Sequence, residues 1–272
     1  MDTKEWDELC SRVNRDMTEY VQRFAAPLTM SEEHGSGLAW GSGTYIKGPS
    51  GTWILTAEHV IAGVPDGGRL AHLPRDGGDY NAAFGTPEVA PWPVDAAALP
   101  IYPAPEFLPL PERVLDPALI AQSYDPVDEE VLFMYGFPGY HLERNDPRLK
   151  DKLIVSRFGH LTVRGKPLLT QAIKPGASIN ASNFDPIRHV AVHYPSIGTS
   201  VSTGMQAPLP NPAGMSGCAL WDTKFVKCDI EGIPWSPHMA EVCGVVWAVH
   251  DNPEVVFVTR IEHVRAALPD VF

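Results

Sequence analysis

Proline and glycine interrupt this chain throughout its length. There are 27 prolines and 23 glycines among 272 residues, and they are spread along the sequence instead of being confined to a tail. Both residues end or bend regular structure, so they divide the chain into many short segments. These segments are rich in valine, isoleucine, threonine and aromatic residues, which favour strands. The pattern predicts an all-β protein, with candidate strands at residues 37–46, 52–56, 131–135, 153–161, 189–194, 219–221, 242–249 and 255–259.

The two ends of the chain differ from this pattern. Between residues 4 and 24 apolar side chains recur every three or four positions, which is typical of an amphipathic helix docked on a core. Residues 261–268 have the same spacing before Pro269 and predict a short closing helix. A proline-rich stretch at 90–111 interrupts the middle, and we expect a boundary between two lobes near residues 110–130.

The charge balance argues against some classes of partner. Lys and Arg number 21 against 33 Asp and Glu, a formal net charge of −12, which disfavours binding to the phosphates of nucleic acids. No run of about 18 uncharged apolar residues occurs, and the opening MDTKEWDELC is charged from its second residue. We therefore expect neither a spanning helix nor a secretory signal, and a cytoplasmic protein that binds no membrane. The four cysteines form no C-x-x-C pair and are expected to be free thiols.

Two passages carry residues suited to nucleophilic catalysis. In GSGTYIKGPSGTWILTAEHV, a glycine-bounded hairpin delivers a strand that ends shortly before His59. In NPAGMSGCALWD, Gly214 and Gly217 flank Ser216 in a tight turn that leads into a strand. A serine hydroxyl needs an adjacent general base, and an imidazole held by a carboxylate is suited to that role. Glycines beside the serine allow successive backbone N–H groups to converge on a developing oxyanion.

The carboxylate that completes such a triad is expected to begin an apolar strand downstream of the histidine. Asp95, in PVDAAALPI, is the only aspartate between His59 and Pro111 that such a run follows. The chain order is then histidine, aspartate, serine, which is the chymotrypsin order and differs from those of subtilisin and the α/β-hydrolases. The context of the serine agrees, because Cys218 occupies the last position of what would be a G-x-S-x-G elbow.

These motifs resemble those of the trypsin-like serine peptidases, in particular bacterial members. TAEHV is similar to the TAAHC or TAAHV motif around the family's histidine, DAAAL to its D-I-A-L-L segment, and GMSGCAL to GDSGGPL. GSGTYI resembles a strand of bacterial members, YGFPG the segment that opens the second barrel, and CGVVWAV the strand that lines the substrate cleft. The resemblance runs from about residue 35 to residue 268.

The resemblance implies two packed six-stranded antiparallel β-barrels with the triad in the cleft between them. On that basis residues 1–30 are an N-terminal helical extension and residues 31–120 form the first barrel, which supplies the histidine and the aspartate. Residues 121–272 form the second barrel, with the serine, the oxyanion hole, the P1 pocket and the short C-terminal helix.

The resemblance also implies roles for single residues. His59 is the general base, Asp95 the carboxylate that orients it, and Ser216 the nucleophile, with the backbone N–H groups of Gly214 and Ser216 as oxyanion donors. No metal and no organic cofactor is expected. No acid occurs from residue 198 to residue 217, so we expect a small or apolar P1 residue, or an acidic one if a histidine meets it. The implied substrate-binding residues are Pro210, at the bottom of the P1 pocket, and Trp247, Ala248, Val249 and His250, on the cleft strand.

Three departures from the family pattern leave alternatives open. Glu58 stands where the family has a small residue, Met215 replaces the aspartate that accepts a new amino terminus in animal digestive members, and Cys218 replaces a glycine. We expect an intracellular serine endopeptidase that acts on protein or peptide substrates and is gated by a conformational change or a regulatory protein partner. The alternatives are a catalytically silent pseudo-protease that serves as a protein-binding module, and an esterase with the same triad.

Two further features, a possible zinc site and a charged cluster, also have simpler interpretations. His189 and His193, together with Cys228 and Cys243, could be imagined as a zinc site, although a structural pair of histidines is the expected interpretation. The charged cluster at 141–152 is a candidate docking loop, with a solvated loop as the simpler interpretation.

Overall fold

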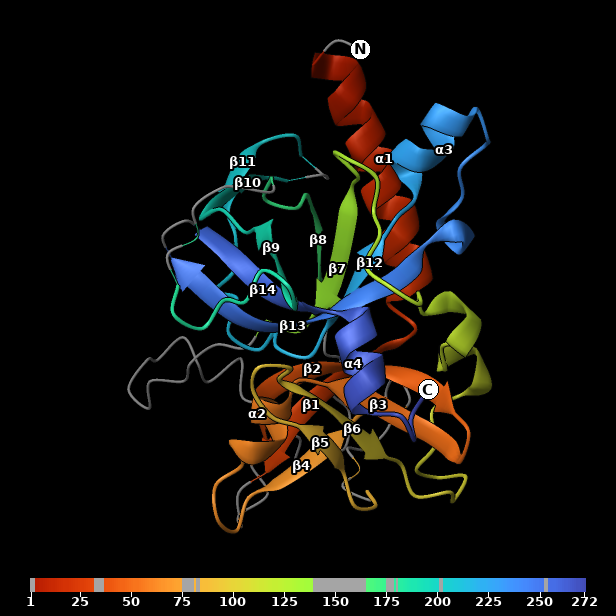
Figure 1. Cartoon of the computed structure of the whole chain (residues 1–272), viewed down its shortest axis with the longest axis vertical. Coiled ribbons are helices and arrows are strands. Elements are labelled where there is room, and N and C mark those ends of the chain that lie inside the picture. Colours follow the sequence, from red (N-terminus) through yellow and green to blue (C-terminus); the bar gives the residue numbers. More distant parts are fainter. Residues whose placement is uncertain are drawn as a thin grey trace.

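The computed structural model describes residues 3–31, 37–74, 81, 84–138, 165–174, 179, 181–200, 203–251 and 254–272. Within these ranges two curled, six-stranded antiparallel sheets lie one above the other, with helices along their sides (Figure 1). The predicted all-β architecture of two six-stranded units is confirmed. The candidate strand at 153–161 and the charged cluster at 141–152 lie outside the described residues.

The first sheet carries the segments around His59 and Asp95. Its strands run in the order β4-β1-β2-β3-β6-β5. They are β1 (Ala25–Ser31), β2 (Gly37–Gly48), β3 (Gly51–Thr56), β4 (Arg69–His72), β5 (Glu88–Ala90) and β6 (Ala96–Pro100). Successive side chains point to opposite faces of a strand, so the neighbours Ile54 and Leu55 belong to two different apolar clusters.

The second sheet carries Ser216 just before one of its strands. Its order is β8-β7-β12-β13-β14-β9. The strands are β7 (Leu132–Gly136), β8 (Lys166–Thr170), β9 (His189–His193), β12 (Ala219–Asp222), β13 (Glu241–Asp251) and β14 (Glu254–Arg260), and a separate hairpin contains β10 (Ile197–Thr199) and β11 (Gln206–Pro208). The two edges of the sheet meet where the Ile173 N–H donates to the Ala191 carbonyl at 2.8 Å, which curls the sheet into a half-barrel.

Helices occupy the ends of the chain and three connections. The α-helices are α1 (Thr3–Val21), α2 (Glu58–Ala62), α3 (Phe225–Glu231) and α4 (Ile261–Ala267), and the 3-10 helices are η1 (Pro111–Arg113), η2 (Pro117–Leu119) and η4 (Pro237–Met239). The helices predicted at both ends are therefore present. The first strand starts at Ala25, inside the 1–30 stretch assigned to the helical extension. No described helix is long and apolar enough to cross a membrane.

Both ends of the chain cross between the two halves. Helix α1 leads into β1 of the first sheet but packs beside β7 and β8 of the second (Figure 1). Its buried Val13 and Met17 belong to the apolar cluster that contains Trp221. At the other end, the chain leaves the second sheet through α4 and returns to the first sheet, where the Val271 carbonyl lies against Gly48 of β2. One continuous core therefore joins the two half-barrels.

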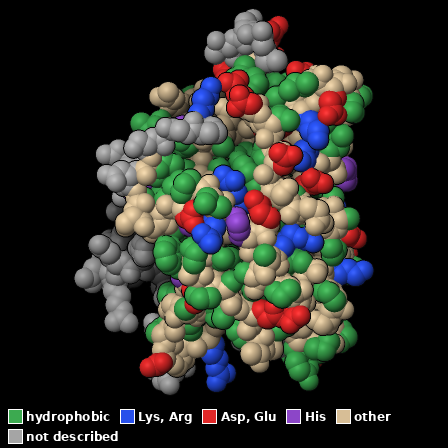
Figure 2. All heavy atoms as spheres, viewed as in Figure 1, with side chains coloured by type: hydrophobic (Ala, Val, Ile, Leu, Met, Phe, Trp, Pro, Cys, Tyr) green, Lys and Arg blue, Asp and Glu red, His purple; other side chains and the backbone are tan. Residues whose placement is uncertain are grey.

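The surface carries both signs of charge. Among the described residues on the face shown in Figure 2, Lys and Arg side chains stand among Asp and Glu side chains and form no continuous basic patch. The described part of that face therefore offers no groove of positive charge for a nucleic-acid backbone to follow.

Candidate active site

His59 lies in the first turn after β3. Pairing of β3 with β6 sets Thr56 opposite Ala97, so the residues just beyond these facing ends, His59 and Asp95, are brought together. Helix α2 is anchored by one buried apolar side chain, Val60. The His59 side chain remains 45% exposed, and the ring can therefore be reached from solvent.

Asp95 holds His59 by three contacts, two to the imidazole and one to the backbone. Its Oδ2 lies 2.8 Å from Nδ1, and its Oδ1 lies 3.1 Å from Nδ1 and accepts the His59 backbone N–H at 3.1 Å. An ionised carboxylate can only accept, so Nδ1 carries the hydrogen and Nε2 presents its lone pair. Asp95 has φ +45°, in the left-handed region that aspartate tolerates better than most residues. The pair has the arrangement of a general base and its orienting carboxylate.

The loop before this carboxylate is held by side chains of the second sheet. His189 Nε2 donates to the Pro93 carbonyl at 2.6 Å, and Thr259 Oγ1 donates to the Val94 carbonyl at 2.6 Å. The Asp185 backbone N–H donates to His189 Nδ1 at 2.9 Å, which makes Nε2 the protonated nitrogen. Burial lowers the pKa of His189 and so favours the neutral ring that these two bonds require.

The turn that precedes Ser216 presents two backbone N–H groups. The Met215 N–H donates to the Pro212 carbonyl at 2.8 Å, and Gly214, the third residue of the turn, has φ +90°. A type II turn requires a φ near +80° at that position, which explains the glycine. In the described part of the chain, neither Gly214 nor Ser216 donates its N–H to a backbone carbonyl. Both groups are available to a developing oxyanion.

Gly217 allows the serine turn to approach the first sheet. Its φ is +89°, and a Cβ there would lie 2.1 Å from both the Ser42 carbonyl oxygen and Thr56 Oγ1. The next residue, Cys218, is fully buried in the core of the second half-barrel, and burial raises the pKa of its thiol. Met215 is buried in the same core. These two departures from the family pattern are therefore apolar packing residues.

The Ser216 hydroxyl forms its hydrogen bond with a backbone carbonyl in this conformation. Its Oγ donates to the Trp247 carbonyl at 3.4 Å, a long hydrogen bond. Among the described residues, no hydrogen bond joins Ser216 to His59. The imidazole and its carboxylate are assembled, while the hydrogen bond of the Ser216 hydroxyl goes to the Trp247 carbonyl and not to Nε2.

The residues implied for the cleft strand lie in different environments. Trp247 is buried, with its ring centroid 4.8 Å from that of His189, so its indole belongs to the core. Val249 is 41% exposed, and Ala248 and His250 are partly buried. Only the segment after Trp247 therefore offers side chains that solvent or a substrate can contact.

Pro210, implied as the bottom of the P1 pocket, is held through its backbone. Its carbonyl accepts the Tyr194 hydroxyl at 2.8 Å. The residue lines a cavity of about 580 Å³ that also touches Cys10 and Asn14 of α1, β8, and the β10–β11 hairpin. The nucleophile turn begins two residues later, at Pro212.

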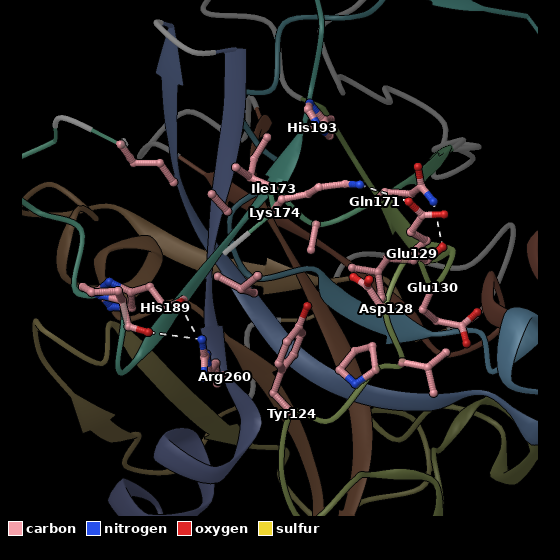
Figure 3. Close-up of a pocket in the computed structure, with 18 of the residues that line it drawn as sticks. Tyr124, Asp128, Glu129, Glu130, Gln171, Ile173, Lys174, His189, His193 and Arg260 are labelled. Carbon is pink, nitrogen blue, oxygen red and sulfur yellow. Dashed lines mark hydrogen bonds and ion pairs between the residues drawn. The ribbon is translucent and has the colours of Figure 1, made fainter. Parts of the chain in front are cut away.

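A second cavity, of about 390 Å³, opens at one end of the second half-barrel (Figure 3). Arg260 and His189 lie at one side and Asp128 and Glu129 at the other, and Lys174 is paired with Glu129 at 3.0 Å. Arg260 is held by the carbonyl of His189, to which its Nε donates at 3.3 Å. The candidate catalytic residues do not line this cavity.

The zinc site weighed from sequence has no assembled ligand set in the described ranges. His189 is buried and engaged as above, whereas His193 is exposed at the far end of β9. Cys228 and Cys243 are buried free thiols. No group of three His, Cys, Asp or Glu side chains within those ranges is placed to hold a metal ion. Glu58, the remaining departure, is the first residue of α2 and is partly buried.

Comparison with solved structures identifies the class of fold. A scabies mite inactivated protease paralogue aligns over 94% of this chain and 95% of its own, with a TM-score of 0.57 and 11% identity. The Rv3671c protease from M. tuberculosis aligns over 96% of this chain and 86% of its own in its active form, with a TM-score of 0.48 and 18% identity. Its inactive form covers 96% and 95%, with a TM-score of 0.47 and 17% identity. No protein-family model matches, and no curated sequence matches either.

The fold of this chain is therefore that of the chymotrypsin-like serine proteases. Three residues beside the site were missed by sequence reasoning: Ser42, His189 as a clamp on the aspartate loop, and Thr259. Ser42 lies inside the GSG motif, which was a usable signal. The other two act across the interface between the sheets, and local sequence carries no sign of such contacts.

Proposed function

We propose that the chain is a serine endopeptidase that hydrolyses peptide bonds through an acyl-enzyme on Ser216. The observation that carries the proposal is the His59 and Asp95 pair, with Nδ1 bound to the carboxylate and Nε2 left as acceptor. A histidine fixed in this tautomer is what a serine nucleophile needs from its base. The free N–H groups of Gly214 and Ser216 also support the proposal, because they can donate to the oxyanion that forms when the serine attacks.

The reaction follows from these positions. The Ser216 hydroxyl rotates from the Trp247 carbonyl to His59 Nε2, which accepts its proton as Oγ attacks the substrate carbonyl. The oxyanion of the tetrahedral intermediate accepts the two turn N–H groups, and Asp95 stabilises the imidazolium. His59 then gives its proton to the leaving amine, whose bond to the carbonyl carbon breaks. Water repeats the cycle on the acyl-enzyme and releases Ser216.

The hydrogen bond from the Ser216 hydroxyl to the Trp247 carbonyl supports a gated enzyme. In the conformation described, Ser216 is bound to Trp247 and not to its base. Because a serine rotates about a single bond between staggered positions, the barrier itself is small, and a substrate or a regulatory protein can select the productive position. We include cytoplasmic location and control by such a partner in the proposal.

The proposed P1 residue is small or apolar. The implied substrate-binding residues Pro210, Ala248 and Val249 carry no charge, and Val249 is exposed. An acidic P1 residue, which His250 could contact, is the second possibility to include in a substrate library.

A pseudo-protease is the second candidate function, and the same hydroxyl favours it. If the bond from Ser216 to the Trp247 carbonyl were the permanent state, the fold would serve only to bind a protein. Labelling with a fluorophosphonate probe, followed by mass spectrometry of the modified peptide, separates the two candidates. The endopeptidase labels at Ser216, and Ser216→Ala and His59→Ala both abolish labelling. Ser196→Ala, at an exposed serine, is the matched control and leaves labelling unchanged.

If labelling is absent even with casein or a peptide library present as substrate, the endopeptidase proposal stands only if an added protein partner restores labelling, and otherwise the binding module replaces it. If labelling occurs but only small esters are turned over, the acyl-enzyme chemistry stands and the peptide substrate is wrong. A comparison of peptide and ester turnover by the same preparation supplies that second result.

A further inference from the structure

Ser42 of β2 connects the first sheet to the turn that carries the nucleophile. Its backbone N–H donates to the Ser216 carbonyl at 2.9 Å, and its hydroxyl donates to the Gly214 carbonyl at 2.6 Å. The hydroxyl also accepts the Phe137 backbone N–H at 2.8 Å. The side chain is completely buried, so water does not compete for these bonds.

The direction of each bond is fixed by chemistry. A backbone N–H can only donate, and a carbonyl can only accept. The single hydroxyl hydrogen of Ser42 therefore points to Gly214, and its lone pair receives Phe137. Bonds arranged head to tail polarise one another, and a low-dielectric surrounding strengthens them. The result is a series of hydrogen bonds, all pointing the same way, that runs from the end of β7 through β2 to the nucleophile turn.

This series of hydrogen bonds fixes the peptide group that follows Gly214, the residue whose own N–H is the oxyanion donor. The carbonyl of the Gly214–Met215 peptide is held by Ser42, and its N–H is held by the Pro212 carbonyl. Gly214 is the residue whose conformation decides where its own N–H points, and glycine adopts positive and negative φ with similar ease. An external restraint is therefore needed to keep φ at +90° in the absence of substrate.

We propose that Ser42 is a positioning residue for oxyanion stabilisation, acting by holding Gly214 in the conformation that exposes its N–H. The proposal rests on the endopeptidase function above. Because the Gly214 N–H contacts the oxyanion and not the ground-state carbonyl, loss of the restraint lowers kcat and leaves KM nearly unchanged. Removing one oxyanion donor outright costs about 10² to 10³ in rate, so Ser42→Ala should cost at least tenfold and no more than about 10³.

The control has to lose a similar buried hydroxyl away from the turn. Thr223, which follows β12, is completely buried, its Oγ1 donates to the Val131 carbonyl at 2.7 Å, and the same oxygen accepts the Phe225 backbone N–H at 3.2 Å. Thr223→Val keeps the shape of that side chain and deletes its hydroxyl. We expect Thr223→Val to lower the urea midpoint as Ser42→Ala does, with kcat within twofold of the parent.

Two measurements separate positioning from general loosening. A peptide boronic acid forms a tetrahedral adduct with one oxygen in the oxyanion position, so its affinity should fall in Ser42→Ala by a factor similar to the fall in kcat. Substrate KM should stay within twofold. Equal losses of kcat in Ser42→Ala and Thr223→Val, or a loss confined to KM, would overturn the proposal.

A third measurement does not depend on activity and separates this proposal from the endopeptidase function. Amide hydrogen exchange at Met215 reports the bond that closes the turn. Faster exchange at Met215 in Ser42→Ala, but not in Thr223→Val, supports the restraint even if the parent protein proves inactive. Unchanged exchange at Met215 contradicts it, whatever the parent's activity.

Discussion

Gly217→Ala tests how tightly the nucleophile turn is packed against the first sheet. The new Cβ would lie 2.1 Å from the Ser42 carbonyl oxygen and from Thr56 Oγ1, where ordinary contacts begin at 3.4 Å. Neither neighbour is the free end of a flexible chain, because Thr56 Oγ1 itself donates to the Ser42 carbonyl at 2.7 Å. The turn that carries Ser216 therefore has to move away.

The cost can be worked from three contributions. A left-handed φ of +89° costs an alanine about 1 to 2 kcal/mol. Displacing the turn breaks the Ser42 N–H to Ser216 carbonyl bond and strains the bond from Thr56, each worth about 1 kcal/mol. Gly217→Ala should therefore lower the free energy of unfolding by about 3 to 4 kcal/mol, which a domain of ordinary stability survives. A nucleophile displaced by about 1 Å should also react about 10²-fold more slowly.

Gly232→Ala is the matched control. Gly232 ends α3 with φ +66°, and a Cβ there would meet nothing within 4 Å. It carries the same conformational cost without the steric clash, so we expect a loss of about 1 to 2 kcal/mol and unchanged labelling of the serine. The assays are urea unfolding and the rate of fluorophosphonate labelling. Equal unfolding free energies for the two variants, with Gly217→Ala labelled at the parent rate, would refute the close approach.

Three other predictions concern single side chains. Asp95→Asn should lower turnover by about 10⁴ with an unchanged circular dichroism spectrum, because an amide can favour the wrong tautomer of the base; a loss below tenfold would contradict the carboxylate's role. Thr259→Val leaves the Val94 carbonyl without its donor and should cost about 1 to 3 kcal/mol in urea unfolding together with slower labelling; unchanged values for both would show that the clamp is dispensable. Burial lowers the pKa of His72 to about 3, so the unfolded chain, with an ordinary value near 6.5, binds more protons between these limits. Its contribution is complete above pH 6.5 and falls with pH by up to about 1.4 kcal/mol per unit, and His72→Gln should flatten that slope in urea titrations from pH 4 to 7.

Local sequence patterns predicted the parts of the site that depend on local structure. The run after Asp95 became the buried strand β6, because a strand covered on both faces has to be apolar along its length. The glycines at 214 and 217 were expected to permit unusual φ, and both have positive φ. The structure also brings His59 and Asp95 within hydrogen-bonding distance, as the paired strands require.

Local sequence patterns could not predict the contacts between segments that are distant in the sequence. Ser42 lies 172 positions from Gly214, and Thr259 lies 165 positions from Val94. Each donor is an ordinary hydroxyl in a strand, and its partner is a backbone carbonyl, which every residue possesses. Trp247 was expected in the cleft because of its strand, but the bulge between Val246 and Ala248 leaves it out of the ladder and its ring lies in the core.

The crossed ends of the chain have a consequence for how the protein unfolds. Helix α1 is covalently joined to the first sheet yet completes the core of the second, while the C-terminal residues leave the second sheet and cover Gly48 of the first. Neither half keeps its full core if the other is lost. Heat or denaturant should therefore melt both halves in one cooperative transition, seen at the same midpoint by fluorescence and by circular dichroism. Unfolding of one half-barrel alone would require one end of the chain to detach from the other half first.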